Sequence, residues 1–382
     1  MYYKDDWDQA RQRLEAFWQG EVIDRCCVAV FAPRRGSQLP PFPELQHGPW
    51  LGGLEALADD DAEGITRWWT DPEANYQRAV TWFENTWFGG EAIPATYVNW
   101  GASAGAGFFG SPPQFRKTTV WYPKVIADWD TWQWEFDAAA NRWWRTIWDI
   151  TAYLTERAEG RYFVGLPEFG NAADNLSLMR GMDDLAVDCL EEPERIAEAI
   201  DFMDAWWVKL HEPLYQLTLA ANQGGGVLPW MSLWAPGRID QLACDFSSLL
   251  SPDTFRDVFV RDIERMGAWM DYGMYHLDGP ACMRHMLDPL LEINCVKAIE
   301  FTPGIGAPPT LTAEYLPRYR RIQQSGRRLY LLAQPHEIEP LLEELSPRGL
   351  YLCTQTDTQD AAEDLLAQVT RWSAAALRRE GR

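Results

Sequence analysis

Eight short apolar segments, most of them followed by sequence with helical spacing, are the feature that most limits how this chain can fold. They are rich in β-branched, aliphatic or aromatic residues and end next to proline, glycine or polar residues. Strands that alternate with helices form parallel sheets, and eight such units are typical of a (β/α)8 TIM barrel. The predicted strands cover residues 27–32, 97–100, 162–167, 229–234, 273–277, 296–301, 328–333 and 349–353.

The connections between these strands are long in the first half of the chain and tight in the second. No linker, repeat or low-complexity segment divides the sequence, so we expect one barrel domain over residues 1–382, with a helical extension at 1–26 and long loops. An open doubly wound sheet is the alternative. Helical spacing is found at residues 5–19, 55–88, 128–158, 183–190, 194–221, 251–270 and 359–379.

The charge and composition of the chain exclude several classes of partner. The net charge of -22 disfavours nucleic acids and anionic membranes, which bind through clustered lysine and arginine. No apolar run is long enough to span a bilayer, and the N-terminus lacks the apolar region of a signal peptide. The seven cysteines include no CxxC pair, which argues against a disulfide framework. We expect a cytoplasmic enzyme that acts on a small molecule.

Ionisable side chains gather where the predicted strands end. Glu168 follows the third strand, His276 and Asp278 end the fifth, Glu300 ends the sixth, and Cys353 ends the eighth. Barrel enzymes carry their chemistry at the carboxyl ends of the strands, so we expect these side chains to face one mouth. Substrate-lining side chains are expected in the loops beside it, among them Trp100, Trp234 and His336.

Four segments of the chain resemble the uroporphyrinogen decarboxylase-like superfamily. They are RGMDDLAVDCLEEPERI (180–196), LLSPDTFRDVFV (249–260), YHLDGP (275–280) and AIEFTPG (298–304). The resemblance implies the barrel fold and a superfamily that contains both decarboxylases and zinc-dependent methyltransferases. The decarboxylases carry an R-Q-A-G-R-Y motif, to which Arg34-Arg35-Gly36 is the nearest match, so uroporphyrinogen itself is not expected as the substrate.

The methyltransferase branch of this superfamily implies a metal site. Its members use His-x-Cys after one strand and a Cys near the last strand, and the related methionine synthases add a Glu between them. Here His276, Asp278, Glu300 and Cys353 take these positions, with Asp278 where the pattern has Cys. A set of nitrogen, oxygen and sulfur ligands can hold a divalent metal. The resemblance therefore implies zinc, methyl transfer to or from a small molecule or a corrinoid carrier protein, and a homodimer.

In the mechanism that the resemblance implies, the metal lowers the pKa of a bound thiol or hydroxyl, which then attacks a methyl group. Asp278, Glu300 and Asp174 would take part in catalysis, while Glu168, Arg180 and Asp245 would contact the substrate.

Other readings of the same residues stay open. In a metal-free decarboxylase or other lyase, Asp278 and Glu300 would donate protons while Arg180 or Arg238 held a carboxylate. In a sugar-active enzyme, Glu168 and Glu300 would form the paired carboxylates that glycoside hydrolysis needs. A non-catalytic binding barrel is the fourth reading.

Overall fold

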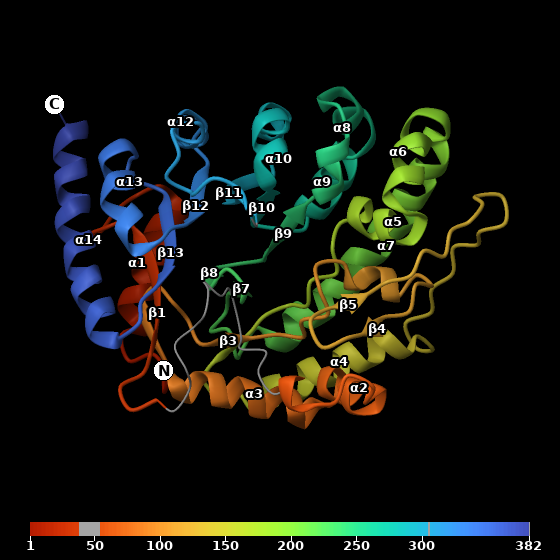
Figure 1. The fold of residues 1–382 in the computed structure, drawn as a ribbon, viewed down its shortest axis with the longest axis horizontal. Helices are drawn as coiled ribbons and strands as arrows, with labels where there is room; N and C mark the ends of the chain where they lie inside the picture. The colour runs from red at the N-terminus through yellow and green to blue at the C-terminus, as the bar shows by residue number, and fades with distance from the viewer. Residues whose placement is uncertain (38–53, 305, 382) are drawn as a thin grey trace.

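The computed structural model describes residues 1–37, 54–304 and 306–381, and its centre is a mostly parallel sheet of seven strands (Figure 1). β2 runs antiparallel to β1, whereas every other pair of neighbours is parallel. The parallel strands are largely apolar because such a sheet is buried on both faces. In sheet order the strands are β2 (Thr86–Gly90), β1 (Cys27–Pro33), β13 (Leu350–Gln355), β12 (Arg328–Leu332), β11 (Val296–Thr302), β10 (Tyr272–Asp278) and β9 (Ile239–Ala243).

Three pairs of short strands lie outside this sheet. They are β3 (Ala95–Thr96) with β6 (Phe163–Val164), β4 (Gln114–Phe115) with β5 (Val120–Trp121), and β7 (Gly226–Leu228) with β8 (Leu233–Ala235). Among the described residues β3 and β6 pair only with each other, so the main ladder stops at β2 and β9. The structure therefore shows an α/β fold with a central parallel sheet, and closure into a barrel remains a prediction.

The strand predicted at residues 229–234 is wrong. Pro229, which has no N–H for a ladder, begins the turn of the β7–β8 hairpin. Ser232 closes that turn with a positive φ of 53°, and its Oγ accepts the N–H of Ile93 at 2.8 Å. The strand that joins the sheet is β9, whose polar Asp240 and Gln241 interrupt the apolar run that sequence patterns use to identify a buried strand.

The helices that follow the parallel strands lie along the outer side of the sheet, from α8 and α9 after β9 to α14 after β13 (Figure 1). The helix predicted at 128–158 begins only at Arg142, because Asn141 caps it by accepting the N–H of Trp144 at 3.0 Å. The helices are α1 (Trp7–Gln19), α2 (Ala62–Thr70), α3 (Pro72–Asn85), α4 (Arg142–Glu156), α5 (Ala172–Arg180), α6 (Met182–Glu191), α7 (Pro193–Thr218), α8 (Pro252–Val258), α9 (Val260–Gly267), α10 (Gly279–His285), α11 (Leu287–Glu292), α12 (Leu316–Gln324), α13 (Ile338–Glu344) and α14 (Gln359–Glu380).

The N-terminal helix α1 packs against the strands outside the main sheet. Its Trp7 ring contacts Phe163 of β6 and Trp234 of β8, with ring centroids 4.8 and 5.6 Å apart. Trp18 donates its indole N–H to the carbonyl of Trp234 at 3.0 Å. All seven cysteines are free thiols. Within the described part of the chain, every helix is too short or too polar to cross a membrane.

Candidate active site

His276 and Glu300 form a pair on adjacent strands, in which Glu300 is buried and His276 is partly exposed. They lie opposite each other in the register of β10 and β11, and Nδ1 of His276 is hydrogen-bonded to Oε2 of Glu300. The other oxygen of Glu300 accepts the hydroxyl of Thr302 at 2.6 Å. Glu300 is fully buried, and each oxygen of its carboxyl has one of these hydrogen bonds. The imidazole is thereby fixed in orientation, which leaves Nε2 as the nitrogen for a ligand.

The surroundings of His276 favour its charged form. Burial lowers the pKa of His276, but the carboxyls of Glu300, Asp245 and Asp278 outweigh burial and raise it to about 9. An imidazolium paired with a buried carboxylate is the expected state of this dyad near neutral pH. Thr302 was missed in the sequence, although its place two residues after Glu300 on one strand puts both side chains on the same face.

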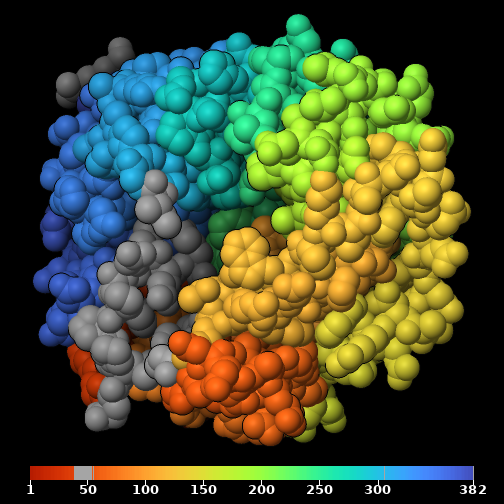
Figure 2. All heavy atoms as spheres, turned by 45° about the vertical axis from the view of Figure 1, so that its right-hand side comes forward, coloured from red at the N-terminus to blue at the C-terminus, as the bar shows by residue number. Residues whose placement is uncertain are grey.

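A cavity of about 400 Å³ lies beside Asp278. Figure 2 shows the surface hollowed between the orange segment that precedes α4 and the green and teal segments. The wall of this cavity includes the three predicted site residues Asp174, Asp245 and Asp278. It also includes Trp121, Tyr122 and Phe246, which the sequence analysis did not predict.

Two of the aspartates in this cavity resist ionisation. Burial and the neighbouring Asp245 raise the pKa of Asp174 to about 8, although the N–H of Phe246, 3.0 Å away, opposes this. Burial also raises the pKa of Asp245, with the carboxyls of Asp278 and Glu300 adding to it and His276 opposing it. Like charges packed in one site cannot all ionise freely, so the cavity favours any ligand that supplies positive charge.

Glu168 lies in the loop after β6 and is held by a residue missed in the sequence. Its Oε1 accepts the hydroxyl of Tyr97 at 2.8 Å. Burial raises the pKa of Glu168 to about 7, against the hydrogen bond from Tyr97 and the charge of His276. Glu168 also lines a second, much smaller cavity with the buried pair His211 and Asp240, whose Nε2 and Oδ2 lie 3.0 Å apart.

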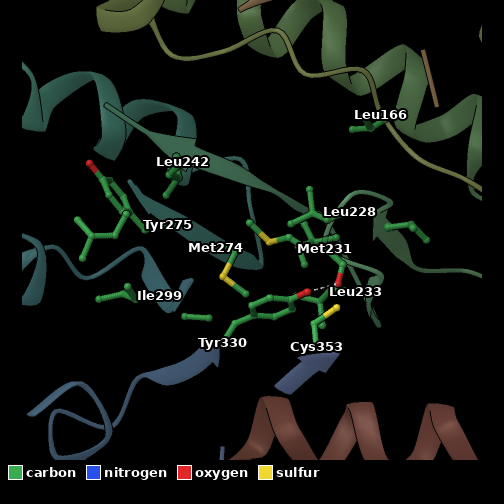
Figure 3. Close-up of a cluster of buried hydrophobic side chains, with 14 of the residues drawn as sticks. Leu166, Leu228, Met231, Leu233, Leu242, Met274, Tyr275, Ile299, Tyr330 and Cys353 are labelled. Carbon is green, nitrogen blue, oxygen red and sulfur yellow. Dashed lines mark hydrogen bonds between the residues drawn. The ribbon is translucent and has the colours of Figure 1, made fainter. Parts of the chain in front are cut away.

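The predicted metal ligand Cys353 lies in apolar surroundings. It is 1% exposed and lies in an apolar cluster with Tyr330 and Leu233 (Figure 3). Burial raises its pKa to about 12, so the thiol is neutral in the absence of a metal ion. Within the described residues, no three His, Cys, Asp or Glu side chains are grouped so that they could hold a metal ion.

Four further predicted substrate contacts are placed elsewhere. Trp100 and Trp234 are core side chains, 1% and 2% exposed, whose indole N–H groups donate to the carbonyls of Trp69 and Asn222. Arg180 binds Asp188, with Nε and Oδ2 2.6 Å apart. His336 lies exposed in the turn after β12.

Comparisons with known proteins give a likeness in fold alone. No protein-family model matches the sequence, and no curated protein matches it. Among solved structures, the chain is similar to a methyltransferase from Methanosarcina mazei, with a TM-score of 0.55 and 12% sequence identity over 98% of this chain and 99% of that chain. Proteins that share a fold can differ in activity. The likeness therefore supports the predicted α/β architecture, and membership of the uroporphyrinogen decarboxylase-like superfamily remains a prediction.

Proposed function

We propose that this protein is a uroporphyrinogen decarboxylase-like enzyme that transfers a methyl group to or from a small molecule. The observation that carries the proposal is the His276–Glu300 pair near the carboxyl ends of β10 and β11, on the same strand as Asp278, which lines the cavity. Parallel α/β enzymes hold their reacting groups at this edge of the sheet. The shared fold with a methyltransferase, matched over nearly the whole of both chains, supports the reaction class.

The proposal includes a closed barrel, with β3 and β6 as its second and third strands. The N–H groups of Phe163 and Gly165 donate to the carbonyls of Pro94 and Thr96, at 2.8 and 2.9 Å, which continues a parallel ladder. On the other side of β6, the side-chain amide of Asn222 bonds both the N–H and the carbonyl of Val164, at 2.9 and 2.7 Å. This amide occupies the place of a neighbouring strand, which explains why no backbone ladder is needed there.

Methyl transfer moves a CH3 group between two nucleophilic atoms. The bond to the donor atom breaks with its electron pair left on the donor, and the acceptor supplies the pair for the new bond. Glu300 and Thr302 position His276, whose Nε2–H can donate a hydrogen bond to the donor or acceptor atom. The aspartates of the cavity contact the small molecule.

The four residues that the resemblance assigns to zinc do not fit a preformed metal site. His276 and Glu300 are bonded to each other, Cys353 lies in the apolar cluster, and the described residues bring no three such side chains together for a metal ion. The roles given above to His276 and the aspartates need no metal. Zinc, a corrinoid carrier and a homodimer remain hypotheses.

The two arginines that the lyase hypothesis needs already have partners within the protein. Arg180 donates to Asp188 and to the carbonyl of Ala127, and Arg238 is paired with Glu212 at 3.1 Å. Neither guanidinium is free to hold a substrate carboxylate. The sugar-active reading is weakened in the same way, because both oxygens of Glu300 are already bonded.

A label-transfer assay tests the proposal. The purified protein is mixed with CD3-labelled methanol, methylamines or methyl thioethers and with a thiol or reduced cobalamin, and mass spectrometry follows the label. We expect transfer by the wild type and a loss of about 100-fold or more in His276→Ala. His285→Ala, which removes an exposed histidine of α10, should retain activity. Equal transfer by wild type and His276→Ala would refute the assignment, and elemental analysis of the same samples tests for zinc.

A further inference from the structure

The cavity beside Asp278 combines negative charge with aromatic surface. Asp174, Asp245 and Asp278 contribute carboxyls, and Trp121 and Tyr122 contribute aromatic rings. Its described lining contains no lysine, arginine or histidine. A cavity of this size, about 400 Å³, falls in the range of small-molecule sites. The raised pKa values of Asp174 and Asp245 keep part of this carboxyl cluster protonated, and a bound cation favours its ionised form, so the cavity favours cations over anions.

Asp245 has a carboxyl oxygen that lacks a hydrogen-bond donor within the described part of the chain, which is a second observation independent of the charge and aromatic rings. Its Oδ1 atom is buried and accepts no hydrogen bond from any residue that the structure describes. A buried acceptor without a donor costs folding free energy, and water or a ligand can supply the missing donor. Asp174 differs, because its carboxyl accepts the N–H of Phe246. Oδ1 of Asp245 can therefore accept a hydrogen bond from a ligand with an N–H or O–H group.

Trp121 gives the cavity an exposed aromatic wall. It lies in the β4–β5 hairpin and is 60% exposed, which is unusual for so large an apolar side chain. Met182, which is 46% exposed, lies on the same cavity. The face of an indole ring attracts alkylated ammonium groups, and the thioether packs against methyl groups. These side chains fit a cation that carries alkyl substituents.

We propose that this cavity binds a small alkylated ammonium compound with an N–H group, which donates to Oδ1 of Asp245 while its alkyl groups contact Trp121. That the compound is the partner in methyl transfer rests on the proposed function, whereas its binding does not. The inference is thus a statement of substrate class that can be tested without turnover.

Binding of three probes with nearly the same shape tests this proposal by calorimetry. All three carry the same hydroxyl, so they differ only in charge and N–H: N,N-dimethylethanolamine, protonated at neutral pH, has both, choline has the charge without an N–H, and 3,3-dimethylbutan-1-ol has neither. We expect the neutral alcohol to bind at least about tenfold more weakly than choline, and the amine to bind most tightly. Equal binding of the alcohol and choline would overturn the assigned charge class. An amine that binds no better than choline would overturn the role of Asp245.

Variants separate the cavity from general effects of charge. Asp245→Asn should weaken binding of the amine and choline about tenfold and leave the alcohol unchanged. Trp121→Ala, at an exposed position that folding tolerates, should weaken both cations a few-fold, roughly as cation–π contacts predict. Asp364→Asn removes the same charge from an exposed position of α14 and should change nothing. Unchanged cation binding in both cavity variants would overturn the proposal.

The two proposals fail in distinguishable ways. If cations bind as described but no labelled methyl group moves, the binding inference stands and the proposed function fails. If label moves from neutral donors while none of the cationic probes binds, the function stands and the assigned substrate class is refuted.

Discussion

The buried carboxyl pair of Asp204 and Asp262 should make the stability of this protein fall as pH rises. Asp204 lies on α7 and Asp262 on α9, where it also accepts the N–H of Ala173 at the start of α5, 3.3 Å away. Burial, and then the charge and hydrogen bond of Asp262, raise the pKa of Asp204 to about 9. The pair therefore holds one proton at neutral pH, and it anchors the helix that carries Asp174.

The size of the effect follows from the proton that the folded pair retains. In the unfolded chain both carboxyls ionise near their ordinary pKa of 3.8, so unfolding releases this proton at neutral pH. The folded pKa is raised, so this contribution to stability is complete below the unfolded pKa and is lost as pH rises through the folded one. Between about pH 5 and 8 the contribution of this pair to the free energy of unfolding should fall by about 1.4 kcal/mol per pH unit.

Asp204→Asn removes this dependence, because the amide of asparagine can donate to Asp262 without ionising. Urea unfolding at pH 6, 7 and 8, followed by tryptophan fluorescence, measures the pH dependence of the free energy of unfolding. From pH 6 to 8 the variant should gain about 2.7 kcal/mol on the wild type. Asp201→Asn is the matched control, since Asp201 lies on the same helix but is half exposed, and Arg265 lowers its pKa. Parallel pH profiles for wild type and Asp204→Asn would refute the shared proton.

Three further substitutions test the site itself. Glu300→Gln should lower the pKa of His276 from about 9, because burial then acts with less opposition, and ¹⁵N NMR of the imidazole reports it; an unchanged pKa would contradict the pairing. Tyr97→Phe should raise the pKa of Glu168 above about 7, since the lost hydrogen bond lowers it, and carboxyl infrared bands should show this shift or disprove it. Cys353→Ser should cost about 1–3 kcal/mol of unfolding free energy by burying a hydroxyl in the apolar cluster, whereas loss of a bound zinc ion would show that Cys353 is a ligand.

Local patterns in the sequence were sufficient for the strands that follow residue 270. The segments predicted at 273–277 and 296–301 lie within β10 and β11, and those at 328–333 and 349–353 coincide with β12 and β13 to within two residues. Their apolar runs are long, and helices separate them, so neighbouring strands had to be parallel. Between β1 and residue 270 the strands are short or polar. The ladder there is carried partly by side chains such as Asn222, which no local pattern reveals.

By itself the sequence determined that His276, Asp278 and Glu300 end consecutive strands of an α/β sheet. Tertiary structure alone decided how they meet, because the register of β10 on β11 sets His276 directly against Glu300. It also decided that Cys353 enters the apolar cluster: β13 is apolar on both faces, so its sequence carries no alternation that says which way a side chain points. The hydrogen bond from Arg180 to Asp188 likewise depends on how α5 and α6 pack together. The ionisable residues that end a strand can be identified from the sequence, whereas the partners of each side chain are set by contacts between distant segments.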